Sequence, residues 1–569
     1  MAKPDAGDVH VLVLAPNCRI DNAAGLSESC GLGQPNDLQA LLVAGWRKWG
    51  TTLAQQMRGA FAFVLYDCTT HSVYAARDHF GLSPLFVADR QDRLYFGTSS
   101  QAVRAILTET VEDNELLLAD FVSGILTDRT QTFFRGIDRF PQAHWALYSA
   151  GRAQSRQYWA LSDVPAREAP QEPAEQFRVL LDRAVGNCVR PGETALMLSG
   201  GLDSSAIAVS AADLPGERLT TFSLTYRNTP GWCDAPHLSA VARATGLQPI
   251  EVPADRHQPL NDMEFWLAAV DGPYLSYGHS VSFQLPRMAK DAGASIVLTG
   301  HGGDEVVSYG FGRLNELALA GKWFQLWMET KGVAGLLGDS RTEIFGRYLA
   351  HFKSLRPILS RLRNSNRQIE QTTIAFLDPE FSRQIAPDRY LRTSVYHKAN
   401  HTERMAHEEA LSVPLQLIAN EIIALCGAAV GIEARSPFFS VDLVEFSLSL
   451  PSEWKLRNGL SRYILRRAYA GALPEETLKR RDKFDFTRPF IAGLVDQRDK
   501  VLDLTGSDLA HRWGLVNRDG LTRARDNLYR NGTGIDRLEA FFLWRVAMLA
   551  MWAEVARQPL AAPVMKEVM

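Results

Sequence analysis

The chain has 569 residues, with 61 basic and 64 acidic side chains and a formal net charge of −3. This length exceeds what one compact core organises, so two or more domains are expected. The near balance of charge argues against an extended basic surface for nucleic acid or an acidic membrane.

The N-terminal part contains short apolar runs separated by turn residues, which predict β-strands with two helices between them. Strands are expected at 9–14, 61–66 and 93–96, and helices at 37–49 and 102–106. Three prolines then lie among charged and small residues in 162–176, which is typical of a linker. We therefore assign a first domain to 1–161 and a linker to 162–176.

The following part alternates buried strands with helices, a pattern that predicts a parallel sheet covered by helices on both faces. The expected strands are 195–199, 219–226, 249–252 and 295–299, and the expected helices are 204–212, 237–245 and 281–292. After about residue 305 the pattern is almost wholly helical. We expect a second domain over 177–557 with a helical insertion at 310–415, and a tail over 558–569.

Phosphate chemistry is indicated by Leu198-Ser199-Gly200-Gly201-Leu202-Asp203-Ser204-Ser205, which follows an apolar strand and opens a helix. The glycines allow the backbone to approach an anion, and the helix N-terminus offers free N–H groups. Asp203 fits this loop if Mg²⁺ lies between the carboxylate and the phosphates. A glycine turn with a serine N-cap would explain Gly200 and Ser204 alone, and no Lys-Ser/Thr pair ends the loop as in a Walker sequence.

A second polar loop, Thr299-Gly300-His301-Gly302-Gly303-Asp304-Glu305, follows the expected strand 295–299. Ligands of parallel sheets gather at the carboxyl ends of strands, so both loops are expected to face one crevice. Asp304 would then share Mg²⁺ with Asp203, since two carboxylates, phosphate oxygens and waters suit this cation.

Several strings resemble a known family. The S-G-G-x-D-S-S string resembles the pyrophosphate loop of N-type ATP-pyrophosphatases, and T-G-H-G-G-D-E resembles the second metal loop of asparagine and β-lactam synthetases. Arg58–Phe63 and Ala76–Phe86 resemble the glutaminase domain of asparagine synthetases.

The resemblance implies an α/β protein: an N-terminal glutaminase-like (Ntn-type) β-sandwich with helices, then a Rossmann-like, parallel-sheet ATP-pyrophosphatase domain with many helices. It also implies ATP and Mg²⁺, with metals at Asp203 and Asp304. The expected nucleotide-binding residues are Leu198, Ser199, Gly200, Gly201, Asp203, Ser204, Ser205, Ser223 and Gly300, with the adenine near Leu198 and Ser223.

The same resemblance implies catalytic residues. His301 occupies the position of the tyrosine in the β-lactam synthetase dyad, and counting back from Glu433-Ala434-Arg435-Ser436-Pro437-Phe438 places the dyad glutamate at Glu421. A histidine oriented by a carboxylate suits deprotonation of an amine. The alternative is a core histidine and a solvated glutamate. Lys483 matches the lysine that stabilises developing negative charge in this family.

The N-terminal domain departs from the glutaminase pattern. That glutaminase uses a cysteine as its first mature residue, whereas this sequence starts Met1-Ala2-Lys3. We therefore expect a domain that does not hydrolyse glutamine, and an amine supplied by the substrate itself.

Two branches of the resemblance fit this expectation: β-lactam synthetases, and the macrolactam synthetases of lasso peptides, which join a peptide N-terminal amine to an Asp or Glu side chain. The insertion and its basic stretch Lys353–Arg367 favour the peptide branch. The expected partners are a ribosomal precursor peptide, a leader-binding protein and a leader peptidase. A small-molecule amide ligase and a non-catalytic precursor-binding scaffold remain as alternatives.

The cellular setting follows from weaker signals. Six cysteines form no C-x-x-C pair, which indicates reduced thiols and a cytoplasmic protein. No basic segment followed by an apolar stretch opens the sequence, so no secretory signal is expected. Phe541–Trp552 is too short to span a membrane and predicts a buried C-terminal helix.

Overall fold

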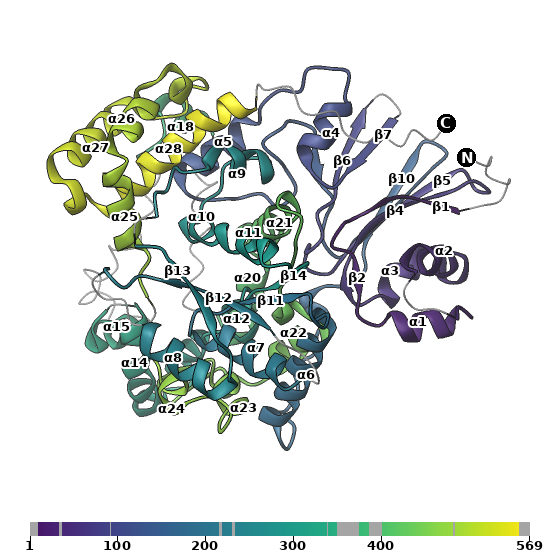
Figure 1. Ribbon diagram of the computed structural model, residues 1–569, viewed down its shortest axis with the longest axis horizontal. Coiled ribbons are helices and arrows are strands. Elements are labelled where there is room, and N and C mark those ends of the chain that lie inside the picture. Colours follow the sequence, from purple (N-terminus) through teal and green to yellow (C-terminus); the bar gives the residue numbers. More distant parts are fainter. Residues whose placement is uncertain are drawn as a thin grey trace.

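The computed structural model contains two sheet-based domains and a group of helices at the C-terminal end (Figure 1). It describes residues 9–33, 37–90, 93–214, 219–229, 234–255, 257–337, 339–349, 375–385, 401–481 and 484–556.

The N-terminal domain is built on a five-stranded antiparallel sheet. Its order is β1 (Val9–Leu14), β4 (Ala62–Asp67), β5 (Ser72–Arg77), β9 (His144–Ser149) and β10 (Arg152–Gln157). Alternate residues of β4 point to opposite faces. Phe63 and Leu65 pack toward helices α1 (Ala23–Ser29), α2 (Leu38–Trp49) and α3 (Leu53–Gln56), while Ala62 and Val64 pack toward a second sheet.

The second sheet of this domain has the order β7 (Arg93–Gly97), β6 (Phe86–Arg90), β8 (Asp138–Arg139). Two short helices, α4 (Ser100–Ile106) and α5 (Glu115–Ser123), follow β7 in the chain. A two-stranded ribbon of β2 (Arg19–Ile20) and β3 (Gly59–Ala60) completes the sheets. The two larger sheets thus enclose an apolar layer, as a β-sandwich does.

The second domain is organised by a five-stranded parallel sheet. Its order is β13 (Pro249–Pro253), β12 (Thr220–Thr225), β11 (Thr194–Met197), β14 (Ile296–Leu298) and β15 (Glu433–Arg435). Strands β12 and β13 lie on one side of β11, and strands β14 and β15, which come later in the chain, lie on the other side. The chain therefore reverses its direction of progress between β11 and β14, and ligands bind at such a point in open α/β sheets.

Helices cover both faces of this sheet. Leu196, Ile296 and Leu298 face one apolar layer, whereas Ala195 and Val297 face the other. The first layer includes α6 (Pro173–Cys188), α7 (Leu202–Ala212), α8 (Asp234–Thr245), α22 (Val441–Ser449) and α23 (Tyr463–Ala468), and the second includes α11 (Gln284–Asp291). The predicted helix 281–292 is divided at Phe283 into α10 (Tyr277–Ser282) and α11.

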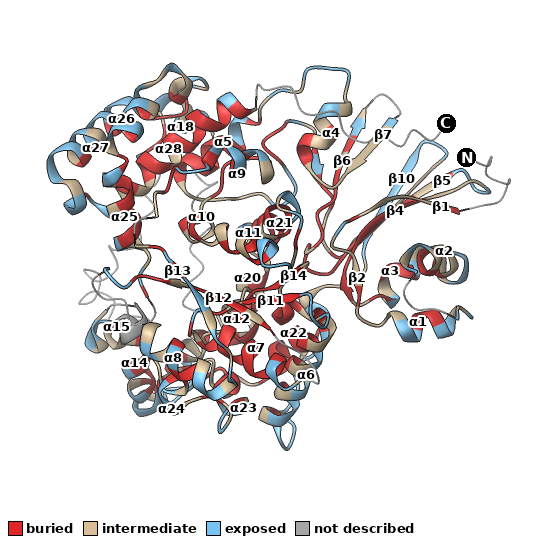
Figure 2. Ribbon diagram, viewed as in Figure 1, coloured by how far each residue is buried: buried red, intermediate tan, exposed pale blue. Residues whose placement is uncertain are grey.

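The C-terminal helix α28 (Arg537–Val555) is buried along most of its length (Figure 2). This confirms the buried helix predicted over 541–552. Its neighbours include α9 (Met263–Ala269), α25 (Thr487–Asp496), α26 (Arg498–Gly506) and α27 (Arg518–Asn531). Among the described residues no single helix is long and apolar enough to cross a membrane; α20 (Glu403–Ser412) and α21 (Pro414–Ala429), bent by 42°, reach that length only together.

The predicted insertion is helical where it is described. It contains α13 (Gly312–Leu319), α14 (Trp323–Leu337), α15 (Arg341–Leu349), α18 (Pro379–Gln384) and α20 (Glu403–Ser412), and α21 (Pro414–Ala429) follows. The basic stretch 353–367 lies outside the described residues. The last four residues of the predicted linker, 173–176, belong to α6. Pro173 stands at the first position of this helix, where the fixed φ of proline is already helical.

Candidate active site

A cavity of about 410 Å³ opens beside the carboxyl ends of β11 and β14. Each strand is followed by a glycine-containing loop and then by a helix, α7 after β11 and α12 (Gly303–Val307) after β14. The fold thus brings both sequence-predicted loops to one crevice.

The first loop turns sharply under α8. Gly200 has φ +76°, and a Cβ atom there would lie 2.7 Å from the backbone nitrogen of Leu238, so only glycine fits. The Ser204 hydroxyl lies 3.0 Å from that of Ser199 and accepts the backbone N–H of Ser199 at 3.2 Å. The loop is therefore folded by its own serines, with its backbone open to the cavity.

The predicted nucleotide-binding residues divide into two groups. The cavity is lined by Ser199, Gly201, Asp203, Ser204 and Gly300. In contrast, Leu198, Ser205 and Ser223 are buried, and the Ser223 hydroxyl donates a hydrogen bond to the Leu198 carbonyl. These three residues therefore pack behind the loop and do not line the cavity.

The second loop packs directly onto the first. A Cβ atom on Gly300 would lie 3.2 Å from the Ser204 nitrogen, and one on Gly303 would lie 2.6 Å from Cβ of Asp203. The glycines thus allow two backbones to approach closely enough for their acidic side chains to meet.

Asp203 and Asp304 share one cationic partner, Arg462. One terminal nitrogen of Arg462 lies 2.6 Å and 2.8 Å from the two Asp203 oxygens and 2.7 Å from Asp304. Burial alone would lower the pKa of Arg462, but the two carboxylates raise it above its ordinary value. The two predicted metal ligands are therefore within reach of a single positive charge.

These residues fit Mg²⁺. Among the described residues no three His, Cys, Asp or Glu side chains converge to form a complete metal cage. Two carboxylates beside an anion-binding loop leave the remaining positions of an octahedral cation to phosphate oxygens and water, which is how Mg²⁺ is usually held.

His301 lies at the cavity wall, and the structure corrects its predicted partner. Its Nε2 atom is 2.9 Å from Oδ1 of Asn420 and 2.9 Å from Nε2 of Gln416. Desolvation by the surrounding protein lowers the pKa of His301 to about 4, against the opposing effect of the Asn420 hydrogen bond. The ring is therefore neutral near pH 7.

Glu421 does not pair with His301. Its carboxylate accepts hydrogen bonds from Arg77 at 2.8 Å and from Arg139 at 2.6 Å, both in the N-terminal domain. Successive helix residues point about 100° apart, so residues 420 and 421 of α21 face different neighbours. The predicted His301–Glu421 pair is wrong for this reason.

The remaining wall of the cavity is largely aromatic and aliphatic. It includes Phe283, Pro286, Ile423, Phe484 and Phe486, and the cavity is also lined by Arg466, Arg480 and Arg481. Lys483 is outside the described residues.

A second cavity of about 90 Å³ shares Asp304, Glu305 and Tyr309 with the first. Its other wall is contributed by the helical insertion, through Phe311 and Asn315 of the α13 region, Tyr348 of α15 and Ala406 of α20. The insertion therefore extends the space around Asp304.

Sequence reasoning missed Arg462, Gln416 and Asn420. Gln416 and Asn420 stand four residues apart in a largely apolar helix, a spacing that places both on one face and could have revealed them. Arg462 carries no such signal, because it precedes α23 with φ +52° and reaches the carboxylates only through the tertiary fold.

Two family models match this chain. Residues 176–554 match the asparagine synthase family, and residues 36–159 match the glutamine amidotransferase domain. The glutamine-hydrolyzing asparagine synthetase 1 of Bacillus subtilis is 23% identical over 467 residues, covering 79% of this chain and 71% of the relative. Asparagine synthetase 3 of the same organism is 22% identical over 460 residues, with 78% and 69% covered.

Among solved structures, the glutamine phosphoribosylpyrophosphate amidotransferase of Bacillus subtilis, complexed with ADP and GMP, aligns with a TM-score of 0.20 and 12% identity. The alignment covers 53% of this chain and 63% of that one.

The family matches and the observed sheets confirm the predicted α/β class, with a glutaminase-like N-terminal domain and a parallel-sheet synthetase domain. The chain belongs to the asparagine synthase family, whose members are ATP-dependent ligases that form AMP and a carbon–nitrogen bond.

Proposed function

We propose that this protein is a macrolactam synthetase of lasso peptide biosynthesis. It activates the side-chain carboxylate of an Asp or Glu in a precursor peptide and closes that carboxylate onto the N-terminal amine of the same peptide. The products are a cyclic amide, AMP and pyrophosphate. The partners are then the precursor peptide, a leader-binding protein and a leader peptidase.

In the first half-reaction, the backbone of Ser199–Ser204 holds the phosphates of ATP, and Asp203 and Asp304 are the residues that would hold Mg²⁺. When bound there, Mg²⁺ would neutralise charge on the phosphate oxygens. A substrate carboxylate oxygen attacks the α-phosphorus, the bond to the bridging oxygen breaks, and pyrophosphate leaves. Arg462 and Arg466, which line the same cavity, supply positive charge on the phosphate side.

In the second half-reaction, the peptide amine attacks the activated carbonyl carbon, AMP leaves, and the amine loses a proton. His301 is placed to accept that proton, because its ring lines the cavity and is neutral near pH 7. In this proposal Lys483 stabilises the oxyanion. Holding both ends of one peptide together contributes up to about 7–11 kcal/mol through proximity.

The observation that carries the peptide assignment is the pair of neighbouring cavities that share Asp304. The larger one has a wall of Phe283, Pro286, Ile423 and Phe486, and the smaller one is bordered by helices of the insertion. These apolar side chains themselves offer no partner to the ammonium and the carboxylate of a free amino acid. A peptide chain presents apolar side chains to the same wall.

The test is substrate selection with purified protein. Synthetic peptides with a free N-terminus and an Asp or Glu at varied positions are compared with free aspartate plus ammonia, and AMP is measured. We expect AMP formation with a subset of peptides, together with loss of one water from the peptide mass. The N-acetylated peptide is expected to release pyrophosphate without ring closure.

Two alternatives make different predictions in the same assay. Preferential turnover of aspartate with ammonia, or of another small amino acid derivative, would assign a small-molecule amide ligase. Absence of AMP with every substrate would favour a non-catalytic precursor-binding scaffold.

A further inference from the structure

We infer that the N-terminal domain positions the proposed base His301 through helix α21, and that Glu421 is the anchor of this arrangement. The inference rests on the proposed role of His301 in amide formation. It gives the glutaminase-like domain a task in the synthetase reaction that does not depend on glutamine.

Helix α21 presents two neighbouring faces to two different parts of the protein. Gln416 and Asn420, four residues apart, both contact Nε2 of His301. Leu417 and Glu421, also four residues apart, both face the N-terminal domain: Glu421 binds its arginines, and Leu417 approaches Gly81 so closely that a Cβ atom there would clash. Because the two pairs are offset by one residue, turning the helix to change one contact changes the other.

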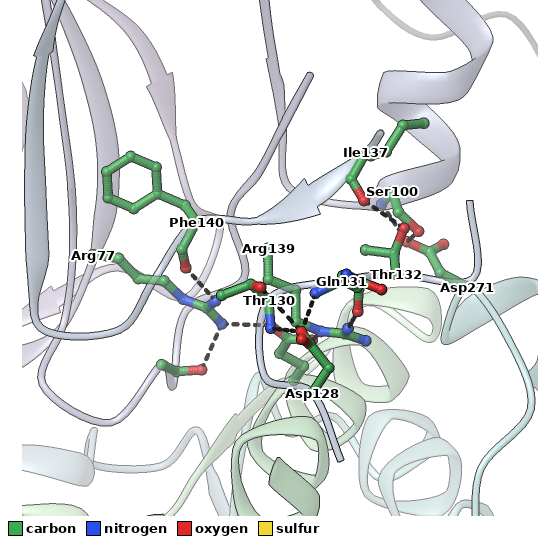
Figure 3. Close-up of polar contacts among 12 residues, drawn as sticks. Arg77, Ser100, Asp128, Thr130, Gln131, Thr132, Ile137, Arg139, Phe140 and Asp271 are labelled. Atoms are coloured by element: carbon green, nitrogen blue, oxygen red, sulfur yellow. Dashed lines mark hydrogen bonds and ion pairs between the residues drawn. The ribbon is translucent and has the colours of Figure 1, made fainter. Parts of the chain in front are cut away.

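The anchor on the N-terminal side is rigid. Arg77 is fully buried, and its guanidinium donates to the backbone carbonyls of Ser83, Gly81 and Phe140 at 2.8–2.9 Å while it also binds Glu421. Arg139 holds the other oxygen of Glu421 and donates to the carbonyl of Gln131. Figure 3 shows Arg77 beside the Phe140 carbonyl, with Arg139 nearby. Both arginines are thus held by backbone carbonyls of their own domain as well as by Glu421.

A second link joins the same two parts at the adjacent residue. The side-chain amide of Asn420 donates to the carbonyl of Phe80 at 2.9 Å, and its oxygen faces His301. The Phe80 loop is itself held by the buried Asp78, which accepts backbone N–H groups of Phe80, Leu82 and Ser83. The position of His301 is therefore tied through one helix to a buried loop of the other domain.

The structure also offers a matched control. Asp271 of the second domain caps α4 of the N-terminal domain by accepting from the backbone N–H and the hydroxyl of Ser100 (Figure 3). It is buried and joins the two domains as Glu421 does, but its hydrogen bonds go to α4 and not to α21 or His301. Loosening the domains in general would affect both positions, whereas of these two residues only Glu421 lies on α21, the helix that contacts His301.

The experiment compares Glu421→Gln with Asp271→Asn in the full-length protein. The chain has 13 histidines, and the ¹³Cε1 signal of His301 is assigned with His301→Gln. We expect Glu421→Gln to shift and broaden this signal while binding a non-hydrolysable MgATP analogue with affinity within about twofold of wild type. With an accepted peptide, ring closure should fall by about tenfold to a hundredfold and peptide-dependent pyrophosphate release should remain.

Asp271→Asn should leave the His301 signal and the ratio of the two half-reactions unchanged. An unmoved His301 signal in folded Glu421→Gln, or an equal change in Asp271→Asn, would overturn the inference. If Glu421→Gln does not fold, Arg139→Lys takes its place, because lysine keeps the charge but loses the Nε hydrogen bond, and a smaller shift in the same direction is expected. If no peptide is turned over by the wild type, the proposed function fails, and the His301 signal still decides the positioning role.

Discussion

Gly303 provides a direct test of the close approach between the two loops. A Cβ atom at this position would lie 2.6 Å from Cβ and 2.7 Å from Oδ1 of Asp203. Carbon atoms in contact normally stand about 3.5–4.0 Å apart. Gly303→Ala must therefore move the Asp203 side chain, or the loop that carries it, by about 1 Å.

The expected result is a loss of function with little loss of stability. A displacement of about 1 Å at a reacting centre costs roughly a hundredfold in rate, or about 2.7 kcal/mol. Alanine favours the helix over glycine by up to about 1 kcal/mol, which offsets part of the roughly 1–3 kcal/mol that overpacking costs. We expect AMP formation to fall by about two orders of magnitude while the melting temperature changes by only a few degrees.

The assay measures the affinity for a MgATP analogue by calorimetry, together with AMP formation from an accepted substrate. Gly186→Ala is the control, because it lies within α6 and its Cβ atom would meet its nearest neighbour at 3.9 Å. Wild-type affinity and turnover in a folded Gly303→Ala protein would refute the view that Asp203 must lie where the structure places it.

Three further predictions concern charged groups, two of them in the site and one, Asp271, at the contact between the domains. Arg462→Ala removes the cation shared by Asp203 and Asp304. The free energy of unfolding of the nucleotide-free protein should therefore fall by roughly 1–3 kcal/mol. Added Mg²⁺ should raise the melting temperature of the Arg462→Ala protein more than that of wild type. Asp304→Asn should weaken Mg²⁺-dependent binding of ATP more than Mg²⁺-free binding, as seen by titration with and without the metal. Burial raises the pKa of Asp271 to about 6, so the folded protein holds this proton more tightly than the unfolded chain does. The resulting contribution to the free energy of unfolding is fully present below the ordinary pKa of an aspartic acid and is lost as pH rises through 6. Paired melting curves compare the free energy of unfolding of Asp271→Asn with that of wild type at pH 5 and pH 7.5. The difference should shift in favour of Asp271→Asn by about 1–2 kcal/mol over this range. The same difference at both pH values would contradict the raised pKa.

The parts of the site that the sequence predicts correctly are local. Strands β11 and β14 are short apolar runs, and each is followed by a glycine loop with an acidic residue, so one rule about parallel sheets places Asp203 and Asp304 together. Strand β15 escaped prediction, because Glu433-Ala434-Arg435 is only three residues long and has no strand-like pattern until it pairs with β14.

The parts that failed depend on tertiary geometry. Counting along the chain led to the correct helix but to Glu421 instead of the neighbouring Asn420. One residue on a helix is a rotation of about 100°, enough to point the side chain at another domain. Arg462 reaches the carboxylates from a turn that lies 158 residues after Asp304 in the chain, a separation that only the tertiary fold closes.

The central claim is that the two carboxylate-bearing loops hold ATP so that a substrate acid becomes an acyl-adenylate. The most direct measurement uses a peptide whose side-chain carboxylates carry oxygen-18, followed by mass spectrometry of the nucleotide product. We expect AMP that contains a single oxygen-18 atom, because the attacking carboxylate oxygen stays on the α-phosphorus when the amide forms. Unlabelled AMP, or ADP as the nucleotide product, would contradict it.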